Sequence, residues 1–325
     1  TESLEQTLGI TAPVGSAPLP AMNAANGTRA RIGGGSGGIV LGTNNTLRGL
    51  TVITTGGTGI QGNGFGTLTL GSDAEVNSTN GPAISLSNGQ ISGAFRSVSA
   101  SGGANGIVLS NTTGTFEVTG TGTAGSGGTI QNTAGDGISL SNTGPVSLSW
   151  MMIQGSGGNG IRGDAVTGFH LRRSTLENNG DAADEHGIRF TSLTGTARID
   201  TVQIRGSYND EVYIANSSGT LDLYMYGNDI SETEMSPRDG GVRIRPSGSA
   251  VINVTLVGNT IGNHTSFGLS YVAEGTAGGT VRVENNTFGA TNNRGIHVVA
   301  GEATTWQGTL DFDVKDNTVT GSQYS

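Results

Sequence analysis

The charged side chains that could do chemistry gather in the middle of this chain, which has 325 residues and is otherwise poor in charge. The segment NGIRGDAVTGFHLRRSTLENNG, residues 159–180, holds three arginines and one histidine. Carboxylates can bind Ca²⁺ and arginines can bind anionic ligands, but opposite charges on neighbouring strands also pair with each other on a solvated surface. Further acidic and basic residues follow: Asp184, Glu185, His186, Arg189, Asp210, Glu211, Arg238, Asp239 and Arg243.

The composition excludes several classes of protein. The net charge is −9 and Lys315 is the single lysine, so a nucleic-acid partner is not expected, because phosphate binding needs a basic surface. The chain contains no cysteine, which excludes disulfides and thiolate metal sites. No apolar run approaches the length of a membrane-spanning helix, so membrane insertion is not expected either.

One short phrase returns along the whole chain: a glycine or similar residue, an aliphatic residue, any residue, and another apolar residue. Its aliphatic members are spaced by 21 to 31 residues, and they are Ile39, Ile60, Ile84, Ile107, Ile138, Ile161, Ile188, Val212, Val242, Leu269 and Ile296. Two further short apolar runs follow in each unit. The last often contains Asn followed two residues later by an aliphatic residue, as in GNTI at Gly258. Three strands per unit predict an all-β, single-stranded parallel β-helix of about eleven coils, because stacked units bury one continuous core.

The GIxL phrases and the Asn-x-aliphatic phrases resemble the right-handed parallel β-helix, pectate-lyase-like superfamily, over residues 30–320. The handedness is implied by the resemblance alone. The superfamily includes polysaccharide lyases and hydrolases, phage tailspikes, and the passengers of secreted bacterial adhesins, so the fold does not select a function. The Gly-His-Gly and Arg-x-Lys phrases of β-helix polygalacturonases are absent, which disfavours that hydrolase chemistry.

The chain is expected to contain one repetitive domain, residues 31–325, preceded by an N-terminal cap and an extended lead-in, residues 1–30. SLEQTLG has the spacing of a short capping helix. The last ten residues, DNTVTGSQYS, complete a third strand without a closing helix. A solenoid exposes its apolar core at an uncovered end, so we expect the chain to continue there, or another copy or partner to cover it.

Strand alternation places the residue after each aliphatic on the outer surface, where stacked coils align such residues in a column. Arg162, Arg189, Tyr213 and Arg243 fall in this column, and His186, two residues before its aliphatic, and Arg238 fall beside it. A ligand-binding surface is expected from these six residues, with Trp306 in a long turn as a separate contact. Similarity to the β-helix lyases implies a possible Ca²⁺ site at Asp184, Glu185, Asp210 and Asp239, with Arg189 or Arg243 as the base; no other cofactor is expected.

Other polar and aromatic residues are predicted to have structural roles. His170 and Arg172 alternate outward and are predicted to be surface residues. Tyr224 and Tyr226 are also predicted to point outward, where they could stack on sugar rings. Trp150, beside the apolar run MMI, is predicted to lie in the core.

The sequence contains no sharp catalytic constellation. This favours a non-enzymatic, extracellular rod for display, adhesion or assembly in a secreted or surface protein of a bacterium. The alternative is a polysaccharide lyase, or a carbohydrate-binding module, that acts on an acidic polysaccharide or a host or cell-surface glycan through the charged patch. Mutually paired charges would favour the rod, whereas a groove over the patch would favour the alternative.

Overall fold

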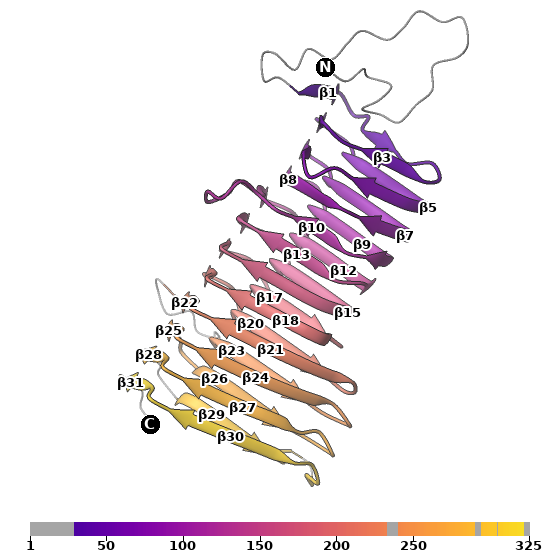
Figure 1. The fold of residues 1–325 in the computed structure, drawn as a ribbon. Helices are drawn as coiled ribbons and strands as arrows, with labels where there is room; N and C mark the ends of the chain where they lie inside the picture. Colours follow the sequence, from indigo (N-terminus) through magenta and orange to yellow (C-terminus); the bar gives the residue numbers. More distant parts are fainter. Residues whose placement is uncertain (1–28, 233–239, 290–293, 304, 322–325) are drawn as a thin grey trace, which may run out of the picture.

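The computed structural model describes residues 29–232, 240–289, 294–303 and 305–321, which form a right-handed parallel β-helix. The strands lie in stacked tiers from β1 at one end to β31 at the other (Figure 1). The described part of the chain is all-β and has no helix that could cross a membrane. The expected N-terminal cap falls on residues outside the described part.

Three ladders of parallel strands run along the solenoid. The first ladder contains β2 (Ile39–Val40), β5 (Ile60–Leu70), β7 (Ile84–Ser92), β9 (Ile107–Gly114), β12 (Ile138–Thr143), the start of β15 (Ile161–Arg172), β17 (Ile188–Thr191), β20 (Val212–Asn216), β23 (Val242–Pro246), β26 (Phe267–Ala273) and β29 (Arg294–Ala300).

The second ladder contains β10 (Phe116–Val118), β13 (Val146–Ser149), the end of β15, β18 (Thr194–Asp200), β21 (Thr220–Tyr226), β24 (Val251–Val257), β27 (Gly279–Glu284) and β30 (Leu310–Lys315). The third contains β11 (Gly128–Gln131), β14 (Met151–Gln154), β16 (Thr175–Glu177), β19 (Gln203–Arg205), β22 (Asp229–Ser231), β25 (Thr260–Gly262), β28 (Thr287–Gly289) and β31 (Thr318–Thr320).

The first turns depart from the predicted three separate strands. There β3 (Asn45–Leu47) pairs with the end of β5, and β1 (Ala30–Gly33), β4 (Leu50–Thr54), β6 (Ala74–Thr79) and β8 (Ala94–Ser101) form a single ladder. Gly64 and Gly66 have positive φ angles, so β5 bends around a corner without leaving its ladder. The turns that carry all three strands, from β9 to β31, are therefore fewer than the about eleven expected.

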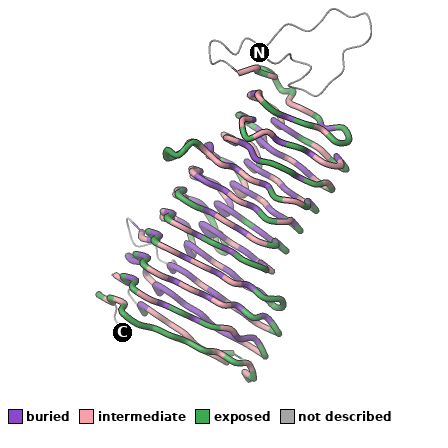
Figure 2. Tube along the Cα trace, viewed as in Figure 1, coloured by how far each residue is buried: buried purple, intermediate pink, exposed green. Residues whose placement is uncertain are grey.

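The predicted internal aliphatic stack is confirmed. Ile60, Ile84 and Ile107 are register partners, and the series continues coil by coil to Leu269 and Ile296. The members between the two ends of the stack are fully buried, and buried residues alternate with more exposed ones along many of the strands (Figure 2). Burying one such side chain stabilises the fold by about 1.5–3 kcal/mol.

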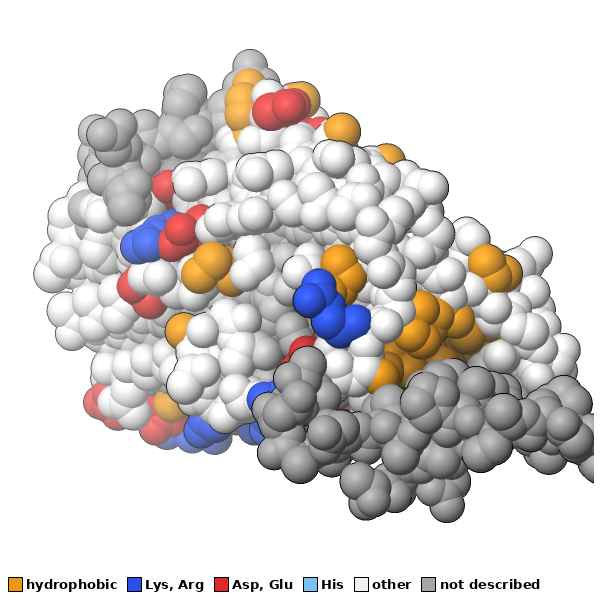
Figure 3. All heavy atoms as spheres, turned by 90° about the horizontal axis from the view of Figure 1, so that it is seen from above, with side chains coloured by type: hydrophobic (Ala, Val, Ile, Leu, Met, Phe, Trp, Pro, Cys, Tyr) orange, Lys and Arg blue, Asp and Glu red, His pale blue; other side chains and the backbone are white. Residues whose placement is uncertain are grey.

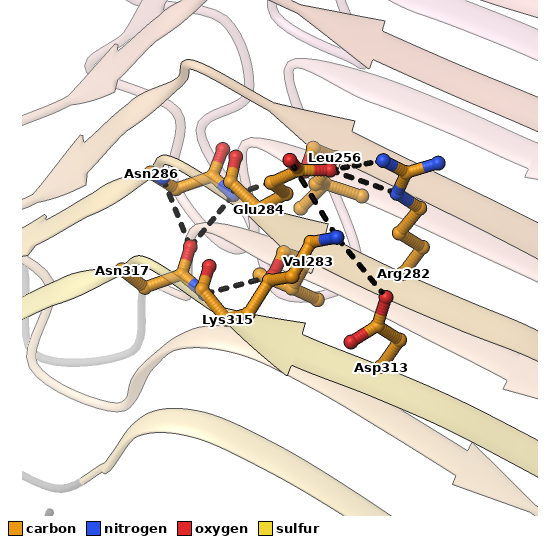
Figure 4. A network of polar contacts seen from close by, with 8 residues as sticks. All are labelled: Leu256, Arg282, Val283, Glu284, Asn286, Asp313, Lys315 and Asn317. Carbon is orange, nitrogen blue, oxygen red and sulfur yellow. Dashed lines mark hydrogen bonds and ion pairs between the residues drawn. The ribbon is translucent and has the colours of Figure 1, made fainter.

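Asparagines at the corner before the third strand form a buried hydrogen-bonded ladder. Asn228 Nδ2 donates to Asn259 Oδ1 at 2.8 Å, and Asn259 Nδ2 donates to Asn286 Oδ1 at 2.8 Å. Asn286 Nδ2 donates in turn to Asn317 Oδ1 at 3.0 Å (Figure 4). The ladder links successive coils where the backbone turns, which explains the recurring Asn-x-aliphatic phrase.

The last described coil exposes residues at core positions. Phe312 and Val314 pair in register with Val281 and Val283, which are buried. Phe312 itself is 67% exposed and Val314 42% exposed. Among the described residues, no further coil covers these two side chains.

Candidate functional site

The predicted outward column is present on the first ladder. Arg162 pairs in register with Arg189, Arg189 with Tyr213, and Tyr213 with Arg243. The residue before each of them is an inward aliphatic that is fully buried, which fixes the outward direction of the column. We call these four residues the arginine column.

A ladder of polar residues in the preceding turns supports the column. Asn159 donates to Asp136 Oδ1 from its backbone nitrogen and from Nδ2, at 2.9 and 2.8 Å. His186 N donates to Asn159 Oδ1 at 2.9 Å. Asp210 occupies the equivalent position one coil further on. Because these groups are buried or nearly so, they fix the turns from which the column strands start.

Each arginine of the column faces a carboxylate. Arg243 donates from Nε to Asp210 Oδ2 at 2.8 Å and from Nη2 to Asp210 Oδ1 at 3.1 Å. Arg189 Nη2 donates to Asp184 Oδ2 at 2.9 Å, and Arg162 lies 3.9 Å from Asp136. Small groups of basic and acidic side chains on a largely uncharged surface are visible from above (Figure 3). The predicted mutual pairing of charges is thus present.

Arg243 is held especially firmly. Its partner Asp210 is 1% exposed, and its guanidinium lies 4.4 Å from the centroid of the Phe267 ring. Parallel hydrogen bonds to one carboxylate fix both the position and the orientation of a guanidinium. Arginine has no acceptor atom and keeps its charge in proteins. This arrangement presents Arg243 as a fixed cation and not as a base.

His186 is buried beneath the column. Its ring stacks on Tyr213, with centroids 4.7 Å apart and an interplanar angle of 24°. Nε2 lies 3.6 Å from Asp184 Oδ1 and Nδ1 lies 3.6 Å from Asp210 Oδ2, distances that are too long for hydrogen bonds. Burial lowers the pKa of His186 to about 4, although the charge of Asp184 opposes this effect. His186 is therefore neutral at neutral pH and positions Tyr213.

A polar groove of about 440 Å³ lies beside the first half of the column. Its lining consists of Asn105, Ala134, Gly135, Asp136, Gly158, Asn159, Arg162, Ala183, Asp184, Glu185 and Arg189. Arg162 and Arg189 thus face one groove from successive coils.

A second hollow of about 170 Å³, which we call the basic hollow, lies beside the far end of the column. Arg243, Arg245, Arg294 and His297 line it together with Glu302. Among the described residues, no carboxylate forms an ion pair with Arg245 or Arg294. Burial, followed by the charge of Arg294, lowers the pKa of His297. Within the described part of the chain, Arg245 and Arg294 are not engaged by an acidic side chain.

The sequence-based Ca²⁺ set does not come together as a metal site in the described part of the chain, where no group of three or more His, Asp or Glu could hold an ion. Asp184 and Asp210 are engaged by arginines. Glu185 Oε2 accepts the backbone N–H groups of residues 181 and 182 at 2.7 and 2.6 Å. The fourth predicted ligand, Asp239, and the predicted binding residue Arg238 lie outside the described residues.

The two tryptophans differ from their expected surroundings. Trp306 is partly buried against the core and donates Nε1–H to Ala277 O at 2.7 Å, so it does not join the column. Trp150 is not a core residue: its φ is 60°, it is half-buried, and Arg173 lies 5.2 Å from the centroid of its ring. A left-handed turn residue interrupts strand alternation, and the side chain therefore leaves the core.

Sequence reasoning missed Arg245 and Arg294 as site residues. Arg245 is two residues after Arg243 in the same strand, so alternation alone places both on the outer face. Arg294 stands two residues before the aliphatic Ile296, the position that His186 and Asp210 occupy in their coils. These signals were present in the repeat.

Residues 117–323 match the family model described as "Right handed beta helix region". The chain belongs to this family. No curated protein matches it. Among solved structures, the periplasmic alginate epimerase AlgG shares 10% identity, with 85% of this chain and 78% of that chain covered and a TM-score of 0.42.

Two further solved structures are similar to the β-helix. The catalytic domain of a GH87 α-1,3-glucanase shares 12% identity, with 90% of this chain and 65% of that chain covered and a TM-score of 0.33. The A-module of the Azotobacter vinelandii mannuronan C-5 epimerase AlgE6 shares 13% identity over 93% and 92% of the two chains, with a TM-score of 0.28. None of these similarities assigns a function to the β-helix described here.

Proposed function

We propose that the first ladder binds an acidic glycan along the arginine column without cleaving it. The observation that carries this proposal is the basic hollow, in which Arg245 and Arg294 have no carboxylate partner among the described residues. Charge-assisted hydrogen bonds from arginine to carboxylate or sulfate oxygens are strong and directional. Arginines that line a hollow are therefore suited to an anionic substituent of a sugar.

The arrangement of the two hollows supports a chain-like ligand. The polar groove borders Arg162 and Arg189, Tyr213 follows on the next coil, and the basic hollow begins at Arg243. These elements lie on consecutive coils of one ladder, at a spacing of about 4.8 Å per coil. An extended acidic polymer lying along the solenoid axis would meet a cation or an aromatic ring at each of these coils.

The side chains favour binding over elimination chemistry. A lyase needs a base beside the sugar, whereas Arg189 and Arg243 are hydrogen-bond donors held by Asp184 and Asp210. His186 is neutral but only 1% exposed, so a substrate cannot reach its nitrogens. We therefore place these residues in recognition.

A non-enzymatic rod is the second candidate function, supported by the ion pairs of Arg189 and Arg243 and by the exposed core positions of β30. Continuous stacking gives the solenoid stiffness, and a display or assembly role requires no further site. In either role we propose an extracellular or periplasmic location, where acidic glycans and surface-displayed rods occur. The two candidates differ in whether a soluble acidic glycan binds.

Isothermal titration of the full chain with polygalacturonate, alginate and heparin oligosaccharides tests the proposal. We expect at least one to bind, and Arg245→Ala/Arg294→Ala to weaken it about tenfold or more, because each lost charge-assisted hydrogen bond contributes about 1.5–3 kcal/mol. The control Arg282→Ala removes an exposed arginine from the second ladder. Absence of binding by all three would leave the rod, and ultraviolet-absorbing unsaturated product would establish a lyase.

A further inference from the structure

The outer side of the second ladder carries a cluster that the arginine column does not use. His170, Arg198 and Tyr224 are register partners on β15, β18 and β21. Two residues further along the same strands, Asp200 and Tyr226 are also register partners. Part of the cluster comes from the basic segment of residues 159–180, whose FHLRR phrase has no role in the first ladder.

A hollow of about 440 Å³ opens at the corner where these strands begin. Its lining is predominantly apolar. The complete lining is Pro145, Val146, Ser147, Thr167, Gly168, Phe169, His170, Gly195, Thr196 and Arg198. A carbon-rich hollow with a few polar groups is the usual form of a small-molecule site.

The backbone explains why this corner is hollow. Gly168 and Gly195 have φ angles of 85° and 75°, and neither places a side chain there. The register between β15 and β18 shifts after Thr167, so that β18 holds one extra residue at this point. Such a bulge bends the strand and redirects neighbouring side chains. The hollow is thus built into the local register.

The polar groups of the cluster are nearly balanced in charge and incompletely hydrogen-bonded. Asp200 Oδ2 accepts a hydrogen bond from Arg198 Nε at 3.3 Å and lies 3.2 Å from His170 Nε2. Asp200 Oδ1 is buried and has no hydrogen-bond partner among the described residues. Because Asp200 offsets the charge of Arg198, the cluster is not arranged for a second anion. It offers the guanidinium donors of Arg198 to hydroxyl groups.

Two tyrosines extend the cluster by one coil. The rings of Tyr224 and Tyr226 stand 6.1 Å apart at an angle of 19°, and the Arg198 guanidinium lies 5.5 Å from each ring centroid. Both rings are half-buried. Tyrosine combines a flat apolar face with a hydroxyl that can donate and accept hydrogen bonds. We call Tyr224, Tyr226, Arg198, Asp200 and His170 the tyrosine platform.

We propose that the tyrosine platform and its hollow bind an uncharged pyranose ring of a glycan, at a site separate from the arginine column. A pyranose has C–H faces that fit the carbon-rich lining and the tyrosine rings, and its edge hydroxyls match the Arg198 donors and the tyrosine hydroxyls. The near-neutral polar set selects against a carboxylate or sulfate on that ring. The chain thus has two sugar-binding faces with different charge preferences.

The same ladder contains a matched control. Arg282 occupies the register position of Arg198 three coils further along the ladder. Arg282 donates a hydrogen bond to Glu284, two residues later in the same strand, as Arg198 does to Asp200 (Figure 4). One coil after Arg282 and Glu284, at the positions where the platform has its tyrosines, stand Asp313 and Lys315. Arg282 and Glu284 do not line the hollow. The control pair therefore has the charge geometry without the aromatic rings or the hollow.

Titration of the full chain with neutral hexaoses of β-1,4-glucose, β-1,3-glucose, β-1,4-mannose and β-1,4-xylose tests this proposal. We expect at least one to bind, and Tyr224→Ala and Arg198→Ala each to weaken that binding at least tenfold. Arg282→Ala should change it less than twofold. Circular dichroism and the thermal midpoint of each variant distinguish loss of binding from loss of fold.

The two proposals can fail separately. Arg245→Ala/Arg294→Ala should leave neutral-sugar binding unchanged, and Tyr224→Ala should leave acidic-glycan binding unchanged. Absence of binding by every neutral hexaose overturns the platform, as does an equal effect of Tyr224→Ala and Arg282→Ala. If Tyr224→Ala abolishes only acidic-glycan binding, the proposed preference for an uncharged ring is wrong.

Discussion

At the scale of single residues, His186 is expected to make the stability of the fold depend on pH. Burial holds its folded-state pKa at about 4, whereas the ordinary value is 6.5. Between these values the unfolded chain binds the proton more strongly. The free energy of unfolding should therefore be highest above pH 6.5 and fall by about 3 kcal/mol as the pH drops to about 4.

Urea denaturation at several pH values between 4 and 7 measures this dependence, with His186→Gln as the comparison. Glu211 has the opposite sign: burial, and then contact with Glu232, raise its pKa well above 4.5, so its stabilising contribution is lost as the pH rises. The wild-type curve is therefore a sum. The contribution of His186 is the difference between the pH dependences of the free energy of unfolding of the wild type and of His186→Gln. If the two curves run parallel, His186 does not cause the expected pH dependence.

At the scale of elements, the buried asparagine ladder is expected to stabilise the stack of third strands. Asn259 donates to Asn286 Oδ1 and Met225 O and accepts from Asn228. Asn259→Ala would leave these buried partners unsatisfied, each at a cost of about 1–3 kcal/mol, so we expect about 3 kcal/mol of destabilisation. Asn253→Ala, a half-buried asparagine in β24, should cost less than about 1 kcal/mol. Equal midpoints in chemical denaturation would contradict this role.

The same ladder shows which elements the sequence could predict. The residue immediately before a third strand is Asn228, Asn259, Asn286 or Asn317, because this corner needs a side chain that can both donate and accept a hydrogen bond. The Asn-x-aliphatic phrase therefore predicted where the third strands begin. The merged strands near β5 were not predictable, because glycine permits a corner to bend inside a strand or outside it. Trp150 was misplaced because alternation was continued through a residue with left-handed φ.

At the scale of the whole molecule, the period of the repeat determines which residues align, and this is why the arginine column was predicted correctly. The period does not determine how far side chains reach across a coil. The engagement of Asp184 and Asp210 by arginines depends on turn geometry that the sequence pattern does not encode. The hollow of the tyrosine platform depends on one extra residue in β18, which is visible only in the register.

The exposed core positions of β30 lead to a prediction about assembly. Phe312 and Val314 occupy positions that are buried one coil earlier, and among the described residues β30 pairs with β27 alone, which leaves its other edge available for pairing. We therefore expect the chain to self-associate through this face as its concentration rises, and Phe312→Lys/Val314→Lys to shift it towards monomer.

Sedimentation velocity over a range of concentrations measures this association. Val40→Lys is a suitable control, because Val40 is 71% exposed at the outward position of β2 and is not a core residue. Phe312→Lys/Val314→Lys should abolish the dependence of the sedimentation coefficient on concentration, because a lysine cannot enter an apolar stack without losing its hydration. The control should keep it, because its side chain lies outside the stack. A wild-type chain that stays monomeric, or an equal response of both variants, would mean that these exposed residues do not drive assembly.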